Sequence, residues 1–299
     1  MIKRFINLAM LVLCVSFAAC DNNEYSRYDA DSAESPYKPM EGRRQVASIK
    51  TTNTIDGRDY SWEHNFSYDK KGRIREINST IVHHYYKEAF GYNRYYKCDI
   101  TSKANYYYLG DALDIVYSVE RVYPEYPDWN AAVSGKDEGL FNANGVLGKY
   151  SVLDFEYSAT SLYAAYIDGG RRYDIVRSSG GNVTGYKIYD ELTDTLIVDH
   201  AERYDFSYDK NKTNFDFSGY FGYWGVEQEI PINSSIYYAT YQLAAFGMLG
   251  AGCQHLPLGI VISNADGTKT TGKWELDAQG YPLSFVDAYG RKTFVTYAE

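Results

Sequence analysis

Residues 60–72 read YSWEHNFSYDKKG, and this stretch decides the fold class. Aromatic and histidine side chains occupy every second position from Tyr60 to Tyr68, with Ser, Glu and Asn between them. Side chains alternate between the two faces of a strand, so the pattern predicts a strand with one buried and one solvated face, typical of antiparallel sheets. Residues 204–208 (YDFSY) and 214–218 (NFDFS) repeat the alternation and predict two further strands.

A four-residue connector, with Asp or Asn first and Gly fourth, recurs between the expected strands. It occupies residues 69–72, 142–145, 264–267, 277–280 and 287–290. At the first position of a type I turn an Asp or Asn side chain accepts hydrogen bonds from the following backbone, and Gly closes the turn in the left-handed conformation. We therefore interpret the recurring aspartates, Asp69, Asp209, Asp277 and Asp287, as turn residues and not as a repeated catalytic group.

These signals predict one all-β domain over residues 45–299. Its architecture is expected to be an antiparallel hairpin meander curled into a barrel-like or strongly bent sheet. One short helix is predicted near 236–249, with Ser234 or Ser235 as its cap and Gly250 at its end. The 33 tyrosines fit this picture, because the tyrosine ring packs on a pleated surface while its hydroxyl reaches a polar partner.

The N-terminus predicts an export signal followed by a lipid anchor. Residues 1–19 carry Lys3 and Arg4 and then a mostly apolar run that is short for a bilayer span, so they are predicted to be a signal peptide. The small residues before Cys20 and the polar run after it resemble a bacterial lipobox and the surface-export signals of Bacteroidota lipoproteins. The resemblance implies acylation of Cys20, with palmitate or a similar chain, and attachment to the outer membrane at the cell surface. The alternative is an ordinary cleaved signal with a chance cysteine.

The residues that follow differ in composition from the expected domain. Residues 20–44 are rich in Asp, Ser, Asn and Pro and predict a disordered tether that holds the domain away from the membrane. Asp31-Ser32-Ala33 matches a short O-glycosylation pattern of Bacteroidota, which makes Ser32 a candidate acceptor. Asp194-Thr195-Leu196 matches the same short pattern. Ser32 is the better candidate, because a flexible tether is accessible.

Two cysteines, Cys98 and Cys253, remain after the signal peptide and the anchor are set aside. An exported compartment permits a disulfide between them, and the alternative is a pair of buried small apolar residues. The formal net charge of −9 provides no basic track for phosphates, so nucleic acid is not an expected partner.

Catalytic motifs are absent from the sequence. The chain has no G-x-S-x-G, P-loop, G-x-G-x-x-G or H-E-x-x-H, and its five histidines lack metal-ligand spacing. We therefore expect no metal, no cofactor and no catalytic residue. Acidic residues are abundant, so a hydrolase with a carboxylate pair remains an alternative.

Two aromatic stretches lie among turn-forming residues: 122–130 (VYPEYPDWN) and 219–225 (GYFGYWG). An exposed tyrosine or tryptophan ring can stack on the apolar face of a sugar. Tyr126, Trp129, Tyr223 and Trp224 are therefore the predicted ligand-binding residues. The alternative is that these rings pack down as lids over the end of the sheet.

The C-terminal half carries a resemblance. NFDFSGYF, YATYQLAAFGMLG, HLP and WELDAQGYPLSF resemble a Bacteroidota lipoprotein family of unknown function with a porin-like β fold. The resemblance implies an architecture and is silent on chemistry. The main hypothesis is a lipid-anchored, non-catalytic envelope protein that binds polysaccharide or a component of an outer-membrane uptake system. The alternatives are a transmembrane porin-like barrel and a glycan-acting hydrolase.

Overall fold

The computed structural model describes residues 25, 27–40, 42–89, 92–151, 153–158, 161–167, 170–179, 181–200, 204–217, 242–250, 252–260, 262–263 and 269–299. The described chain is almost entirely β. Its strands are β1 Val46–Ile55, β2 Arg58–Tyr68, β3 Ile74–Ala89, β4 Tyr92–Leu109, β5 Ala112–Val122, β6 Ala131–Phe141, β7 Leu147–Tyr150, β8 Leu153–Ser158, β9 Ser161–Ile167, β10 Arg171–Arg177, β11 Val183–Asp190, β12 Thr195–His200, β13 Tyr204–Lys210, β14 His255–Ile260, β15 Ile262–Ser263, β16 Lys269–Thr270, β17 Lys273–Leu276, β18 Pro282–Val286 and β19 Lys292–Tyr297.

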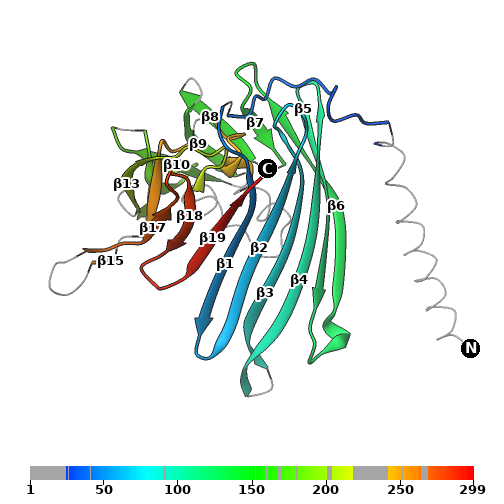
Figure 1. Cartoon of the computed structure of the whole chain (residues 1–299), viewed down its shortest axis with the longest axis vertical. Coiled ribbons are helices and arrows are strands. Elements are labelled where there is room, and N and C mark those ends of the chain that lie inside the picture. The colour runs from blue at the N-terminus through cyan, green and yellow to red at the C-terminus, as the bar shows by residue number, and fades with distance from the viewer. Residues whose placement is uncertain are drawn as a thin grey trace, which may run out of the picture.

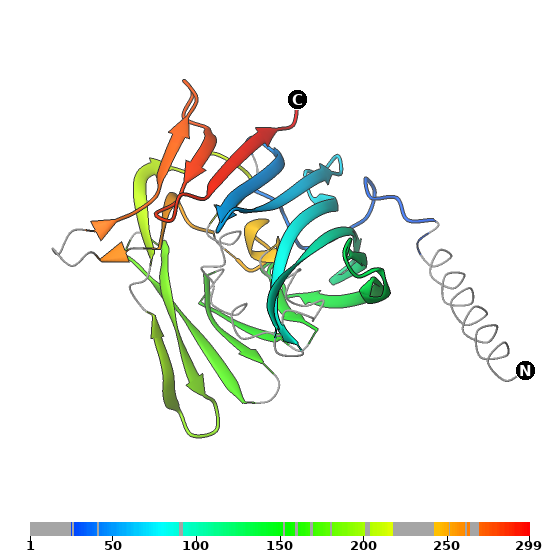
Figure 2. The ribbon, with the colours of Figure 1, turned by 90° about the horizontal axis from the view of Figure 1, so that it is seen from below.

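Fifteen of these strands form one sheet in which neighbouring strands run antiparallel. From β12 the order descends to β1, and then continues through β19, β18 and β17. Pairing of β1 with β19 brings the first and last strands together. Figure 1 shows the long strands β1–β6 side by side, and Figure 2 shows the sheet curling around an interior. The predicted meander of hairpins is confirmed.

A two-stranded ribbon, β13 and β14, lies between the two ends of this sheet. The backbone N–H of Gly272, just before β17, donates to Leu258 O at 2.7 Å, and Trp274 Nε1 donates to Pro257 O at 2.6 Å. At the other end, the N–H of Val183 in β11 donates to Cys253 Sγ at 3.2 Å. Residues 253–258 therefore link β11 to β17 and make the sheet barrel-like, although its edge strands do not pair with each other.

The two faces of the sheet differ in polarity. In β2, Tyr60 and His64 are buried on the inward face, while Asn65 and Ser67 are exposed, which confirms the predicted alternation. The outward face of β1–β4 carries ion pairs between neighbouring side chains: Lys50–Glu63, Lys103–Glu76 and Lys97–Asp99. The inward side is therefore the core side, and the outward side is polar.

The inside of the sheet is filled at one end by two segments of the chain, residues 211–217 and 242–250, here called the interior plug. Phe215, Phe217, Leu243 and Phe246 are each at most 3 % exposed. Rings within the plug meet at centroid distances of 5.2–5.3 Å. The strand predicted over 214–218 is wrong for its described residues: Asn214, Phe215, Asp216 and Phe217 are all buried and belong to no strand.

The second plug segment contains the described part of the predicted helix. Residues 242–245 are helical, and Figure 2 shows this turn inside the curled sheet. The N–H of Met248 donates to Leu243 O, the N–H of Gly247 donates to Ala244 O, and Gly247 has a φ of 75°. This is a Schellman motif, so the helix ends at Gly247 and not at the predicted 249 or Gly250. Residues 236–241 lie outside the described part.

The predicted turn chemistry is present at four of the five connectors. In each, the Gly N–H donates to the carbonyl of the first residue, and that residue's Oδ1 accepts from the backbone two and four residues later. The four glycines have φ of 76–82°. Residues 264–267 lie outside the described part. Asp209 differs from the prediction, because it belongs to β13 and no such turn follows it.

One turn aspartate has a further role. Asp69 Oδ2 accepts from Arg73 Nε at 2.7 Å, and both side chains are almost fully buried. The Arg73 guanidinium lies over the ring of Tyr108, and its terminal nitrogens donate to the carbonyls of Ala33 and Ala30. A buried guanidinium is stable only with such a complete set of partners.

Residues 27–40, here called the N-terminal segment, pack against the domain, where the sequence predicted a disordered tether over 20–44. Tyr37 is 4 % exposed, stacks on Tyr108 and Phe141, and donates its hydroxyl to Phe246 O at 2.6 Å. Figure 1 shows this segment running along one end of the long strands. Its aromatic rings and the Arg73 bonds outweigh the polar composition that suggested disorder.

Cys98 and Cys253 are both buried free thiols, so the alternative to a disulfide holds in the structure. Cys98 of β4 packs in a small buried cluster with Ile81 of β3 and Ile100 of β4. Cys253 instead belongs to the main core cluster, together with residues of the plug. Among the described residues, no helix has the length and apolar character needed to cross a membrane.

Candidate functional site

Three aromatic rings of the β5–β6 connection pack together with one ring of β4, and the four are here called the aromatic cluster: Tyr123, Tyr126 and Trp129 of the connection, and Tyr96 of β4. Tyr126 and Trp129 stack with their centroids 4.6 Å apart and an interplanar angle of 18°. Tyr96, on the inward face of β4, meets Tyr126 edge-on at 5.0 Å and Trp129 at 5.2 Å. Tyr123 meets Trp129 at 5.9 Å. These distances are those of attractive aromatic pairs.

Local backbone structure holds this loop in place. A single 3-10 turn, Pro127–Trp129, begins at Pro127. The fixed φ of proline suits the first position of a helix. The N–H of Trp129 donates to Tyr126 O at 2.9 Å, and the N–H of Tyr126 donates to Tyr123 O at 3.0 Å. The side-chain oxygen of Asn130 accepts from the N–H of Tyr123 at 2.7 Å, which ties the two ends of the loop together. The rings are therefore positioned before any ligand arrives.

Exposure divides the cluster into a support and a contact surface. Tyr96 is 7 % exposed, whereas Trp129 retains 38 % exposure and Tyr126 is partly exposed. Tyr96 supports the stacked pair from below, and Trp129 presents its ring to solvent. A rigid, partly exposed tryptophan suits stacking on the apolar face of a sugar, since little conformational entropy remains to be lost.

The rings continue along the inward face of the sheet. Tyr123 meets Tyr85 of β3 at 6.3 Å, Tyr85 meets His83 at 4.6 Å, and His83 meets Tyr60 of β2 at 5.6 Å. Partial burial, together with the neighbouring His84, holds the pKa of His83 below its usual value, so this imidazole is neutral at pH 7. The row thus presents aromatic rings and a neutral imidazole.

The predicted site residues have different outcomes. Tyr126 and Trp129 are brought together, and both pack on Tyr96 while they keep some exposure. Tyr223 and Trp224 lie outside the described residues. The sequence reasoning missed Tyr96 and Tyr123. Alternation along residues 92–109 would have placed Tyr96 inward, but only the strand register shows that it lies beneath Trp129.

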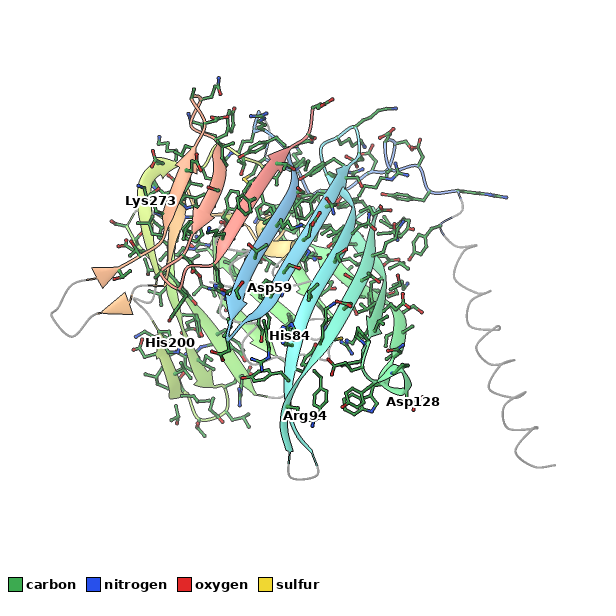
Figure 3. All side chains as sticks on the ribbon, turned by 60° about the horizontal axis from the view of Figure 1, so that its bottom comes forward. Asp59, His84, Arg94, Asp128, His200 and Lys273 are labelled. Carbon is green, nitrogen blue, oxygen red and sulfur yellow. The ribbon has the colours of Figure 1, made fainter. Side chains whose placement is uncertain are left out.

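Catalytic geometry is sparse around the cluster. The carboxylates of its own loop, Glu125 and Asp128, are exposed, and Figure 3 shows Asp128 at the same end of the sheet as Arg94. Among the described residues, no group of three or more His, Cys, Asp or Glu side chains is arranged to hold a metal ion.

Comparison with known proteins shows similarity to solved structures only. No family model and no curated protein matches the chain. A porin-like protein from Bacteroides uniformis is similar in structure: the alignment covers 88 % of this chain and 100 % of that one, at 13 % sequence identity and a TM-score of 0.44. At this TM-score the similarity carries no argument about function, so the function must be inferred from the residues of this chain.

Proposed function

We propose that this protein is a non-catalytic saccharide-binding lipoprotein of the bacterial cell envelope, with the aromatic cluster as its contact surface. The observation that carries the proposal is the stacked Tyr126–Trp129 pair, which is held by a hydrogen-bonded loop, supported by buried Tyr96 and left partly open to solvent. Trp129 combines 38 % exposure with ring contacts to Tyr96, Tyr123 and Tyr126.

The proposed location in the cell envelope rests on the sequence. Acylation of Cys20 would attach the chain to the outer membrane, and Ser32, exposed in the N-terminal segment, is a proposed O-glycosylation acceptor. Because residues 27–40 pack on the domain, only a short stretch would separate the domain from its anchor, and the domain would lie close to the membrane surface. Incorporation of an alkyne-tagged palmitate, and its loss in Cys20→Ala, tests the anchor.

The polarity of the sheet weighs against a lipid-spanning barrel. Such a barrel needs an outward apolar band, with the polar side chains turned inward. Here the outward face of β1–β4 carries the ion pairs Lys50–Glu63, Lys103–Glu76 and Lys97–Asp99, and the inward face carries the core. Lys or Glu facing lipid would cost several kcal/mol each. We therefore propose that the outward face of the sheet contacts water and not lipid.

A glycan array tests the proposed function. The purified protein and its Trp129→Ala variant would be applied to plant, host and bacterial polysaccharides. We expect the wild type to bind a subset of them and the variant to lose about tenfold or more in affinity, because an aromatic stacking contact contributes about 0.5–1.5 kcal/mol and the apolar area that it buries adds to this. Ser134→Ala, an exposed position on the adjacent strand β6, is the control and should bind as the wild type does. A blank array would refute the proposal.

A further inference from the structure

Arg121 is a partly buried arginine with no hydrogen bond or ion pair to any residue in the described part of the chain. It lies on β5, directly opposite Ile100 on β4 and Ala131 on β6, and shares the inward face with Ile100. Its Nε is buried and has no hydrogen-bond partner. No ion pair of Arg121 occurs with any residue that the structure describes.

Three other buried or partly buried arginines have partners for their guanidinium groups. Arg177, whose Nε is also buried without a hydrogen bond, donates from Nη1 to Gly181 O at 2.7 Å. Arg73 is paired with Asp69 and bonds to two carbonyls. Arg172 lies 2.9 Å from both Asp174 and Asp194. A partly buried guanidinium without an anion costs free energy, because it has lost water without gaining a counter-charge. Arg121 is left in that condition at the edge of the aromatic cluster.

The position of Arg121 places its charge beside the cluster. Tyr123 follows it by two residues, a spacing of about 7 Å in extended chain. Ile100, directly opposite Arg121, belongs to a buried cluster with Cys98, and Tyr123 packs against this cluster. Tyr123 packs against Trp129. Tyr123 therefore connects the two groups: Arg121 lies two residues before it on β5, and Trp129 is in ring contact with it.

The chemistry of the missing partner follows from the side chain. A guanidinium presents a planar fork of N–H donors that matches a carboxylate in a two-point hydrogen bond. Since the chain has a net charge of −9, its long-range field repels anions, and an acidic ligand would be held only by a local cation. Building on the proposed function, we infer that the site takes an acidic saccharide, whose ring stacks on Trp129 and whose carboxylate pairs with Arg121.

The test compares acidic saccharides with neutral counterparts of the same backbone. Polygalacturonate, alginate and heparosan, each beside its carboxyl-reduced form, would be titrated into the full-length protein by calorimetry. Dextran sulfate beside dextran forms the sulfate arm. We expect at least one uronate to bind about tenfold or more tightly than its reduced form. Arg121→Gln should remove that preference and leave binding of the reduced form unchanged, while Arg121→Lys should retain part of it.

Matched variants separate the inference from the proposed function. Arg75→Gln removes an exposed arginine near the opposite end of β3 and should leave the preference intact. Arg121→Gln should not lower the melting temperature, as it would if Arg121 served the fold. If a uronate and its reduced form bind equally, and Trp129→Ala weakens both, the acidic-ligand inference falls and the proposed function stands. An Arg121-dependent preference for dextran sulfate alone would overturn the carboxylate assignment. If no saccharide binds, both fall.

Discussion

The two ends of the long strands share the same alternating sequence pattern, yet they differ in how far their inward side chains are buried. At the end covered by the N-terminal segment, the plug fills the interior, and Phe215 and Phe217 are at most 1 % exposed. At the end that carries the β5–β6 loop, Trp129 keeps 38 % exposure and Arg121 lacks an acceptor among the described residues. The first end is filled by its own side chains, and the second end carries the proposed binding surface. If the proposal holds, the residues that stabilise this sheet and those that bind are separated along the strands.

The largest effect is expected in the plug. Phe246→Ala should lower the free energy of unfolding by about 3–5 kcal/mol, because Phe246 is 3 % exposed and contacts Phe66, Tyr68 and Phe215. Urea unfolding monitored by circular dichroism measures it. A loss below about 1 kcal/mol would mean that the plug is not the core of this end.

The next largest loss of stability is expected from substitutions in the N-terminal segment. Tyr37→Ala should cost about 3 kcal/mol, because the ring is buried between Tyr108 and Phe141. Tyr37→Phe keeps the ring and loses only the bond to Phe246 O, so it should cost about 1 kcal/mol. If neither variant changes the urea midpoint, residues 27–40 behave in solution as the tether that the sequence predicted.

A pH titration probes the boundary between the two ends, where His64 is buried and bonds to Ser79 Oγ at 2.7 Å. Burial lowers the pKa of His64 from 6.5 to about 4. Between these values the unfolded chain binds a proton that the folded chain does not, so stability is complete above pH 6.5 and falls toward pH 4. The loss should be on the order of 3 kcal/mol.

The matched control for this titration is His64→Gln, which cannot take up the proton. Unfolding free energies would be measured from pH 7 to pH 4 for both proteins, because carboxylates also titrate in this range. The wild type should lose more stability than the variant over the window. Equal slopes would show that His64 is not held neutral by its surroundings.

Local patterns predicted the parts of the fold that local chemistry decides. The alternation from Tyr60 to Tyr68 identified β2, and the Asp-to-Gly spacing identified four hairpin turns, since each depends on a few neighbouring residues. The same alternation misled at Phe215 and Phe217, because a segment enclosed by a curled sheet is buried on both sides. The N-terminal segment was misjudged on composition, although Tyr37 within it was a signal for packing.

The candidate site was predictable in part for the same reason. Tyr126 and Trp129 stand among turn-forming residues, and this local signal pointed to them. Tyr96 and Arg121 come into the site through the pairing of β4 with β5, a register that no short stretch of sequence specifies. The support and the charge of the site were therefore invisible to local reasoning, whereas its exposed rings were not.

The smallest expected change in stability accompanies the most direct test of this account. Trp129→Ala should change the unfolding free energy by less than about 1 kcal/mol, because the ring is 38 % exposed and Tyr96 still covers the strands beneath it. The measurement is one calorimetric titration of wild type and Trp129→Ala with a polysaccharide selected on the array, with the melting temperature recorded on the same samples. We expect Trp129→Ala to lose about tenfold or more in affinity relative to the wild type, at a nearly unchanged melting temperature. A melting temperature lowered as far as in Phe246→Ala, with the affinity unchanged, would contradict it and make the aromatic cluster a second core.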